Sequence, residues 1–125
     1  LMKLQELLSR YRAGQRDFRN LNLIAVNLRN QNLSGANLSG SNLTGANLTR
    51  TNLSYTNLTD ANLTKANLQE TNLTQANLSN ANLSDVDLSQ ANCYQTYLKG
   101  ATLGNSVESS TPGAMDANQE TVKLG

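Results

Sequence analysis

One apolar position recurs every five residues from Phe18 to Leu103. Leucine occupies sixteen of these eighteen positions, and only Phe18 and Cys93 differ. A five-residue period fits neither an α-helix nor a continuous β-strand, whose side-chain periods are 3.6 and 2. The pattern therefore predicts a repeat architecture, in which neighbouring units bury a shared core.

Within one unit, the leucine and the residue two before it face the same side of a short extended segment. That second inward position is small, being Ala in eight units and Thr in four. The two residues after the leucine are mostly turn formers. If each turn is close to a right angle, four units close a square coil, and coils stack about 4.8 Å apart. Eighteen units at four per coil give four and a half coils.

The unit resembles the pattern Ala-(Asp or Asn)-Leu-x-x of the pentapeptide-repeat family, as in ANLTK at residues 61–65. The resemblance covers residues 16–105 and implies an all-β solenoid, a right-handed quadrilateral β-helix. An N-terminal helix followed by Arg16-Asp17-Phe18 resembles small cyanobacterial members of the family in particular.

Residues 1–15 form a separate amphipathic segment. Leu4, Leu7, Leu8 and Tyr11 recur at helical spacing, and Gly14 favours a helix stop. We expect a helix that caps the open end of the stack, because terminal repeats need capping. A basic helix that meets a membrane or a partner is the alternative. It would need the same single apolar stripe as the cap.

The five-residue period stops after Leu103. Residues 106–125 are poor in apolar side chains and contain Pro112-Gly113, so we expect a flexible tail or a short capping helix. The last coil would otherwise expose strand edges, which invite pairing. Either this tail or a second copy of the chain would cover it, and the latter would be a homodimer through the C-terminal end.

Composition argues against several classes of partner. Ten basic and nine acidic residues leave a net charge of +1, too little to attract nucleic acid or an anionic membrane. A DNA-mimicking topoisomerase (gyrase) inhibitor, which the family resemblance raises, would need a longer and strongly acidic rod. No apolar stretch approaches membrane-spanning length. We expect a cytoplasmic protein, with a removed presequence as an alternative because the chain begins at Leu1.

Catalytic chemistry is not expected. The chain contains no histidine, and its one cysteine, Cys93, replaces a central leucine and should be a buried, inert thiol. Asp85 and Asp87 are the nearest pair of carboxylates, but a flat-sided rod offers no pocket around them. We therefore predict a protein that is not an enzyme, with no catalytic residues, no metal site and no cofactor.

Asparagine precedes the central position in fourteen of the eighteen units. We expect a structural role, with the amides bonding from coil to coil and to nearby backbone. Ten of these asparagines form Asn-Leu-Ser/Thr sequons. We read the sequons as by-products of the repeat rather than as glycosylation sites.

The predicted function is a non-enzymatic scaffold that presents a rigid surface to an unknown protein. Exposed tyrosines are typical of interfaces, although Tyr94 and Tyr97 could instead shield the last coil under the tail. A third hypothesis, binding to ice or crystal surfaces through Thr columns, is weakened because the columns are short and mixed. The candidate partner surface comprises Tyr55, Tyr94, Tyr97, Arg16, Arg19 and Arg29.

Overall fold

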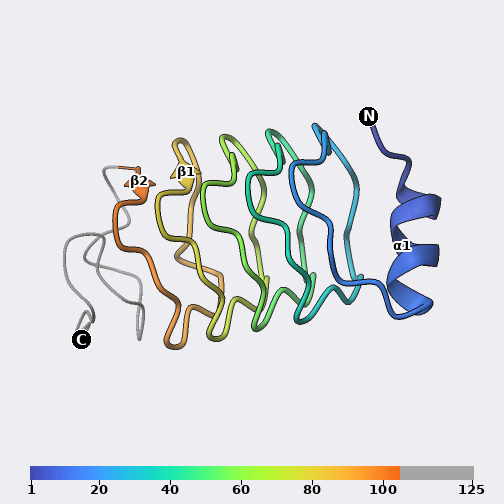
Figure 1. The fold of residues 1–125 in the computed structure, drawn as a ribbon. Coiled ribbons are helices and arrows are strands. Elements are labelled where there is room, and N and C mark those ends of the chain that lie inside the picture. The colour runs from blue at the N-terminus through green and yellow to red at the C-terminus, as the bar shows by residue number, and fades with distance from the viewer. Residues whose placement is uncertain (105–125) are drawn as a thin grey trace.

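The computed structural model describes residues 1–104, which form a stack of coils with one helix at its N-terminal end (Figure 1). The elements are helix α1 (Leu4–Arg12) and the two-residue strands β1 (Asn82–Leu83) and β2 (Thr102–Leu103), which pair in parallel. Elsewhere the coils are joined by isolated parallel bridges. Each side of a coil thus contributes only one or two paired residues, because a turn follows at once.

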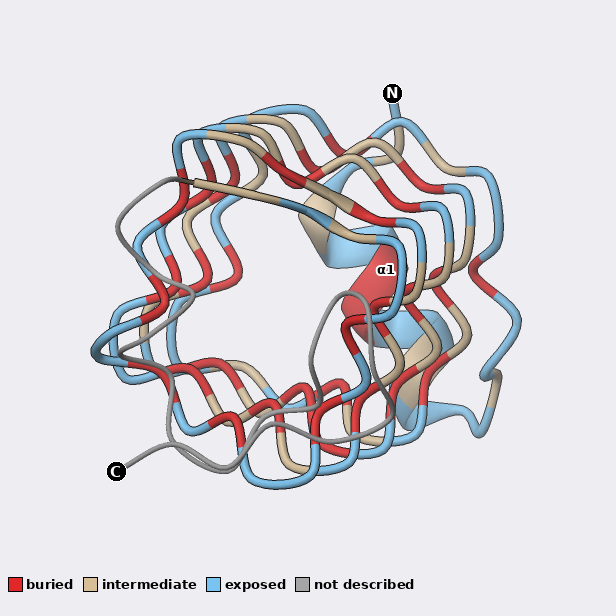
Figure 2. Cartoon of the chain, turned by 90° about the vertical axis from the view of Figure 1, so that its left-hand side faces the viewer, coloured by how far each residue is buried: buried red, intermediate tan, exposed pale blue. Residues whose placement is uncertain are grey.

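Neighbouring coils pair between positions twenty residues apart. Asn42 bridges Asn62, and Asn62 in turn bridges Asn82. The Leu43 N–H donates to the Asn62 carbonyl at 2.7 Å, and the Asn62 N–H donates to the Ser41 carbonyl at 3.0 Å. The view along the stack shows the coils superimposed in a four-sided outline (Figure 2). The predicted twenty-residue coil is confirmed.

The central positions line the interior. From Phe18 to Leu98 each is at most 3% exposed, and Leu103 is half-buried. Leu7 and Leu8 of α1 are buried in the same cluster. A fully buried leucine contributes about 1.5–3 kcal/mol, so a repeated single position supplies a core without large aromatic side chains.

The corners depend on a residue of positive φ. The second residue after the leucine takes this conformation in most units, as in Ala25 (φ 58°), Gly40 (φ 68°) and Tyr55 (φ 60°). The next N–H then donates back to the leucine carbonyl, for example from Val26 to Leu23 at 3.1 Å. This β-turn bends the chain and starts the next side.

One unit, residues 86–90, departs from the regular stacking predicted for all eighteen. The N–H groups of Leu68 and Asp87 have no backbone partner within residues 1–104. The Glu70 N–H donates to Gln90 at 2.8 Å, whereas the equivalent Arg50 N–H donates to Gln69. Gln90 also lacks the positive φ found at other corners. The pairing has slipped by one residue at this corner.

Helix α1 is shorter than the segment 1–15 predicted for it. The Met2 N–H donates to the Asn22 carbonyl at 3.2 Å, so the chain start pairs with the first coil instead of entering the helix. At the other end the chain turns through Ala13 into Gly14, whose φ is 100°. The predicted tail, residues 106–125, lies outside the described residues.

Two glycines at equivalent corners predict different costs of substitution. A Cβ on Gly40 would lie 2.1 Å from Asn20 Oδ1, whereas one on Gly45 would meet nothing within 4 Å. Both have nearly the same φ, 68° and 67°. Gly45→Ala should therefore cost about 1 kcal/mol in free energy of unfolding, the strain of a left-handed alanine. Gly40→Ala should cost slightly more by chemical denaturation, because the end of the exposed Asn20 side chain must also move.

The control is the same pair of substitutions in an Asn20→Gly background. Removing the Asn20 side chain should make Gly40→Ala and Gly45→Ala equally costly. Equal costs in the wild-type background would contradict the close approach of Asn20 to Gly40.

The buried thiol of Cys93 should make the free energy of unfolding depend on pH. The side chain is 1% exposed, and burial raises the pKa of its thiol from 9.0 to about 12. The unfolded chain would release this proton first, so the free energy of unfolding should fall as pH rises from about 9 to about 12. The limiting slope is about 1.4 kcal/mol per pH unit. Denaturation of wild type and Cys93→Leu at several pH values measures it, and the same slope in both proteins would contradict the assignment.

Candidate interaction surface

The asparagines before the central positions bind locally. In all fourteen, Oδ1 accepts the N–H of the residue two positions on. Asn62, for example, accepts from the Thr64 N–H at 3.0 Å and from its hydroxyl at 2.6 Å. The expected bonding to nearby backbone is confirmed. The expected coil-to-coil bonding of the amides was wrong, because the local turn uses the oxygen.

This geometry also explains the sequons. In eight units the Ser or Thr hydroxyl after the leucine donates to the preceding asparagine at 2.6–2.7 Å. These hydroxyls include a column of the kind considered for ice binding, namely Thr44, Thr64 and Ser84. In these units the Asn and the Ser or Thr of the sequon are therefore hydrogen-bonded to each other within one turn.

Hydroxyl groups that face the core are satisfied by backbone. Thr71 donates to the Leu48 carbonyl and Thr51 to the Leu28 carbonyl, both at 2.7 Å. Thr56 and Thr96 likewise donate to the carbonyls of Leu53 and Leu73, so all four inward threonines are paired with backbone. Within the described residues, no buried side-chain nitrogen or oxygen lacks a partner. The interior thus leaves no polar group for a ligand.

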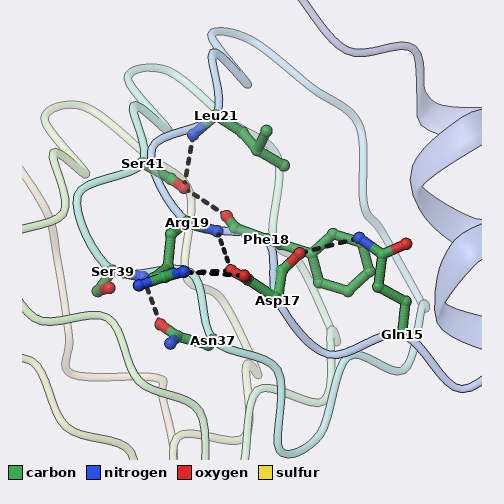
Figure 3. Close-up of polar contacts among 8 residues, drawn as sticks. All are labelled: Gln15, Asp17, Phe18, Arg19, Leu21, Asn37, Ser39 and Ser41. Atoms are coloured by element: carbon green, nitrogen blue, oxygen red, sulfur yellow. Dashed lines mark hydrogen bonds and ion pairs between the residues drawn. The ribbon is translucent and has the colours of Figure 1, made fainter.

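The arginines predicted for the partner surface do not gather. Arg19 donates to both carboxylate oxygens of Asp17, at 2.8 and 3.0 Å, and this hydrogen bond lowers the pKa of Asp17 and raises that of Arg19 (Figure 3). Arg16 donates to the Tyr11 carbonyl at 2.8 Å, and its guanidinium carbon lies 3.7 Å from the centre of the Tyr11 ring. Arg29 is exposed at a different corner. Arg19 is therefore engaged within the first coil, and Arg16 is engaged with α1.

Asp87, one of the two neighbouring carboxylates, is engaged within its own turn. Asp87 Oδ1 accepts the Ser89 N–H at 2.8 Å, and hydrogen bonds from the Ser89 side chain and backbone lower the pKa of Asp87. No group of three potential metal ligands occurs within residues 1–104. In that same part of the chain, no helix is long and apolar enough to cross a membrane.

Two of the tyrosines, in contrast, share one longitudinal corner. The twenty-residue register aligns the turns at residues 34–35, 54–55, 74–75 and 94–95. We call this row the tyrosine edge, because it carries Tyr55 and Tyr94, which are 59% and 55% exposed. Tyr97, 45% exposed, follows on the adjoining side. Tyr11 donates to the Ser34 carbonyl at 2.7 Å, where the edge begins.

The tyrosine edge is also uncharged. Among the described residues, each of the other three rows of corner turns carries charged side chains: Arg19, Asp60 and Lys99 in one, Lys65 and Asp85 in the next, and Arg29, Arg50 and Glu70 in the last. The tyrosine edge has only Ser, Gly, Thr, Gln and Tyr. The sequence pattern placed Tyr94 and Tyr97 among the candidate partner residues, but it gave no sign that Tyr11 reaches the same row. The register places Ser34 in the column of Ser54 and Tyr94, whereas the contact of Tyr11 with Ser34 depends on how α1 packs.

Comparison with known proteins identifies the repeat. The family described as pentapeptide repeats matches residues 17–50, 32–69, 41–80 and 66–105, with eight copies. No curated protein matches this chain significantly.

Two solved structures from the cyanobacterium Nostoc PCC 7120 resemble the fold. HetL, a pentapeptide-repeat protein involved in heterocyst differentiation regulation, is 38% identical, with a TM-score of 0.79 over 81% of this chain. This chain spans 43% of the length of HetL. The protein alr5209 is 28% identical, with a TM-score of 0.58 over 83% of this chain and 87% of its own. The four-sided coil, the five-residue unit and these matches agree: the chain belongs to the pentapeptide-repeat family, which forms right-handed quadrilateral β-helices.

Proposed function

We propose that this chain is a non-enzymatic scaffold that presents the tyrosine edge to a partner protein. The observation that carries the proposal is the exposure of Tyr55, Tyr94 and Tyr97 along an uncharged corner and its adjoining side. Tyrosine supplies a large contact area while losing little conformational entropy, and aromatic residues are enriched at interfaces.

The exposure of Tyr55 supports this role. Its φ of 60° is the corner conformation of the repeat, which Arg50, Lys65 and Gln75 share at equivalent positions. The side chain of Tyr55 is 59% exposed, so packing within the stack does not require an aromatic residue at this corner. Its ring is therefore available for contact with another molecule.

The proposed scaffold has about four and a half coils, with α1 as the cap of its first coil. Two observations support the cap. Leu7 and Leu8 are buried, and the Tyr11 hydroxyl donates to the Ser34 carbonyl. The cap keeps the N-terminal end of the stack from pairing with other chains. Contacts with a partner would then fall on the sides and corners.

The likeness to HetL favours a regulatory role. HetL is involved in heterocyst differentiation regulation. We extend to this chain only the general idea that a repeat surface regulates another protein by binding it. The net charge of +1 does not support mimicry of DNA. The homodimer through the C-terminal end stays a proposal.

The test is capture of partners from an extract of the native cells. Immobilised wild-type protein should retain a specific protein, and the double variant Tyr55→Asn/Tyr94→Ser should retain about tenfold less, because the aromatic contacts are lost. Asparagine tolerates the left-handed corner, and serine occupies the equivalent position 54. The fold should therefore survive both changes.

The matched control is Ile24→Ser, which removes a 44%-exposed apolar side chain from another corner. It should retain the partner as wild type does. Light scattering of the purified protein shows whether a captured protein could be a second copy of the chain. No specific capture by wild type, or equal capture by the tyrosine variant, would contradict the proposal.

A further inference from the structure

We propose that the slipped corner at residues 86–90 is a joint, at which the last described coil, residues 86–104, opens while the coils before it stay paired. The Leu68 and Asp87 N–H groups have no backbone partner within residues 1–104, and residues 67 and 87 form no bridge there, although the register aligns them. The other three sides of the last coil pair regularly with the coil before. One side of four is therefore weakly held.

The side that precedes the joint is more exposed than its equivalent one coil earlier. Asn67 is exposed, whereas Asn47, in the same column of the stack, is half-buried. Both are asparagines that accept the N–H of the residue two positions on. The difference therefore comes from the coil that follows each of them, which pairs with Asn47 and not with Asn67.

The residue that accounts for the slip is Val86, at the small inward position of its unit. In three of the four inward threonines, the hydroxyl donates to the leucine carbonyl twenty-three residues earlier. Thr71, for example, donates to Leu48 at 2.7 Å. At position 86 the equivalent carbonyl belongs to Leu63, and valine has a methyl group where threonine has its hydroxyl. A carbon atom needs about 3.3–3.6 Å from a carbonyl oxygen, so this side of the coil cannot approach as closely.

Val26 has the same inward position and causes no slip. Its unit pairs regularly with the next coil, and the Asn47 N–H donates to the Val26 carbonyl at 2.9 Å. The residue twenty-three positions before Val26 is Lys3, which precedes helix α1 and belongs to no coil. A methyl group at position 26 therefore meets no leucine carbonyl of a preceding coil. The difference between the two valines follows from their coils and not from their residue type.

Loss of pairing on one side lowers the cost of opening. Parts of a protein with fewer internal hydrogen bonds open at a lower free energy than the whole. Each missing backbone bond can shift such an opening equilibrium by up to about tenfold. The last coil carries Tyr94 and Tyr97, whereas Tyr55 belongs to a coil that stays paired. Opening at the joint would therefore move two of the exposed tyrosines relative to the third.

The experiment is amide hydrogen exchange, measured by NMR on the full chain of wild type and Val86→Thr. The threonine hydroxyl can donate to the Leu63 carbonyl, so the regular pairing should form. Protection of the Leu68 N–H should then rise about tenfold or more. The Leu73 and Leu78 N–H groups, which donate to the last coil, should gain about tenfold as well, because that coil now opens less often.

Three controls separate the joint from other causes. The Leu53 and Leu58 N–H groups, one coil earlier, should exchange equally in wild type and variant. Val86→Ala, which matches the alanines elsewhere in its column, should restore the pairing without a hydroxyl. Asp87→Asn should not restore it, because Asp87 Oδ1 already accepts the Ser89 N–H as the asparagines do at other units.

Three results would overturn the proposal. Unchanged exchange at Leu68 in both Val86 variants would remove Val86 as the cause, and restored pairing in Asp87→Asn would assign the slip to the carboxylate. A gain at Leu68 without any gain at Leu73 and Leu78 would mean a local pairing defect and no joint. The capture of a partner through the tyrosines is measured separately, so the proposed function can stand or fall independently.

Discussion

Backbone pairing between positions twenty residues apart is the constraint on which the rest of the structure depends. It requires each side to present its leucine inward at the same height, and each corner to turn within two residues. One example is the pair of backbone hydrogen bonds that Asn62 makes with Leu43 and Ser41 of the preceding coil. Parallel bridges repeat this arrangement along the stack. Because each side contributes only one leucine and one small residue to the interior, this repeated pair of positions is enough to form the core.

Because of the same constraint, most polar side chains have a structural role. Asparagine oxygens close the turns, and inward threonine hydroxyls bond to nearby backbone carbonyls, mostly those of the coil before. Side chains that point away from the corners have no such structural role, and we propose that partner recognition depends on them. Tyr55, Tyr94 and Tyr97 are the large exposed members of that set, and they lie together because the register brings distant turns into one row. The paired coils then hold these tyrosines at fixed positions relative to one another.

Much of this could be predicted from the sequence, because the leucine period specifies both the side and the coil. The direction of the asparagine bonds could not, since residue type permits both a local turn and a coil-to-coil contact. The slipped corner at residues 86–90 also escaped prediction: Val86 resembles Val26, whose unit pairs regularly. The position of Tyr11 depended on how α1 meets the first coil, which no periodicity describes. The pairing of Arg19 with Asp17 was missed for a similar reason, because it is a choice between rotamers.

Amide hydrogen exchange measured by NMR tests the twenty-residue pairing most directly. The N–H groups of central residues such as Leu43 and Leu63, which donate to the following coil, should be strongly protected. Leu68 and Asp87, which lack backbone partners within residues 1–104, should exchange much faster than these. Protection that follows another period, or fast exchange at Leu43 and Leu63, would contradict the account.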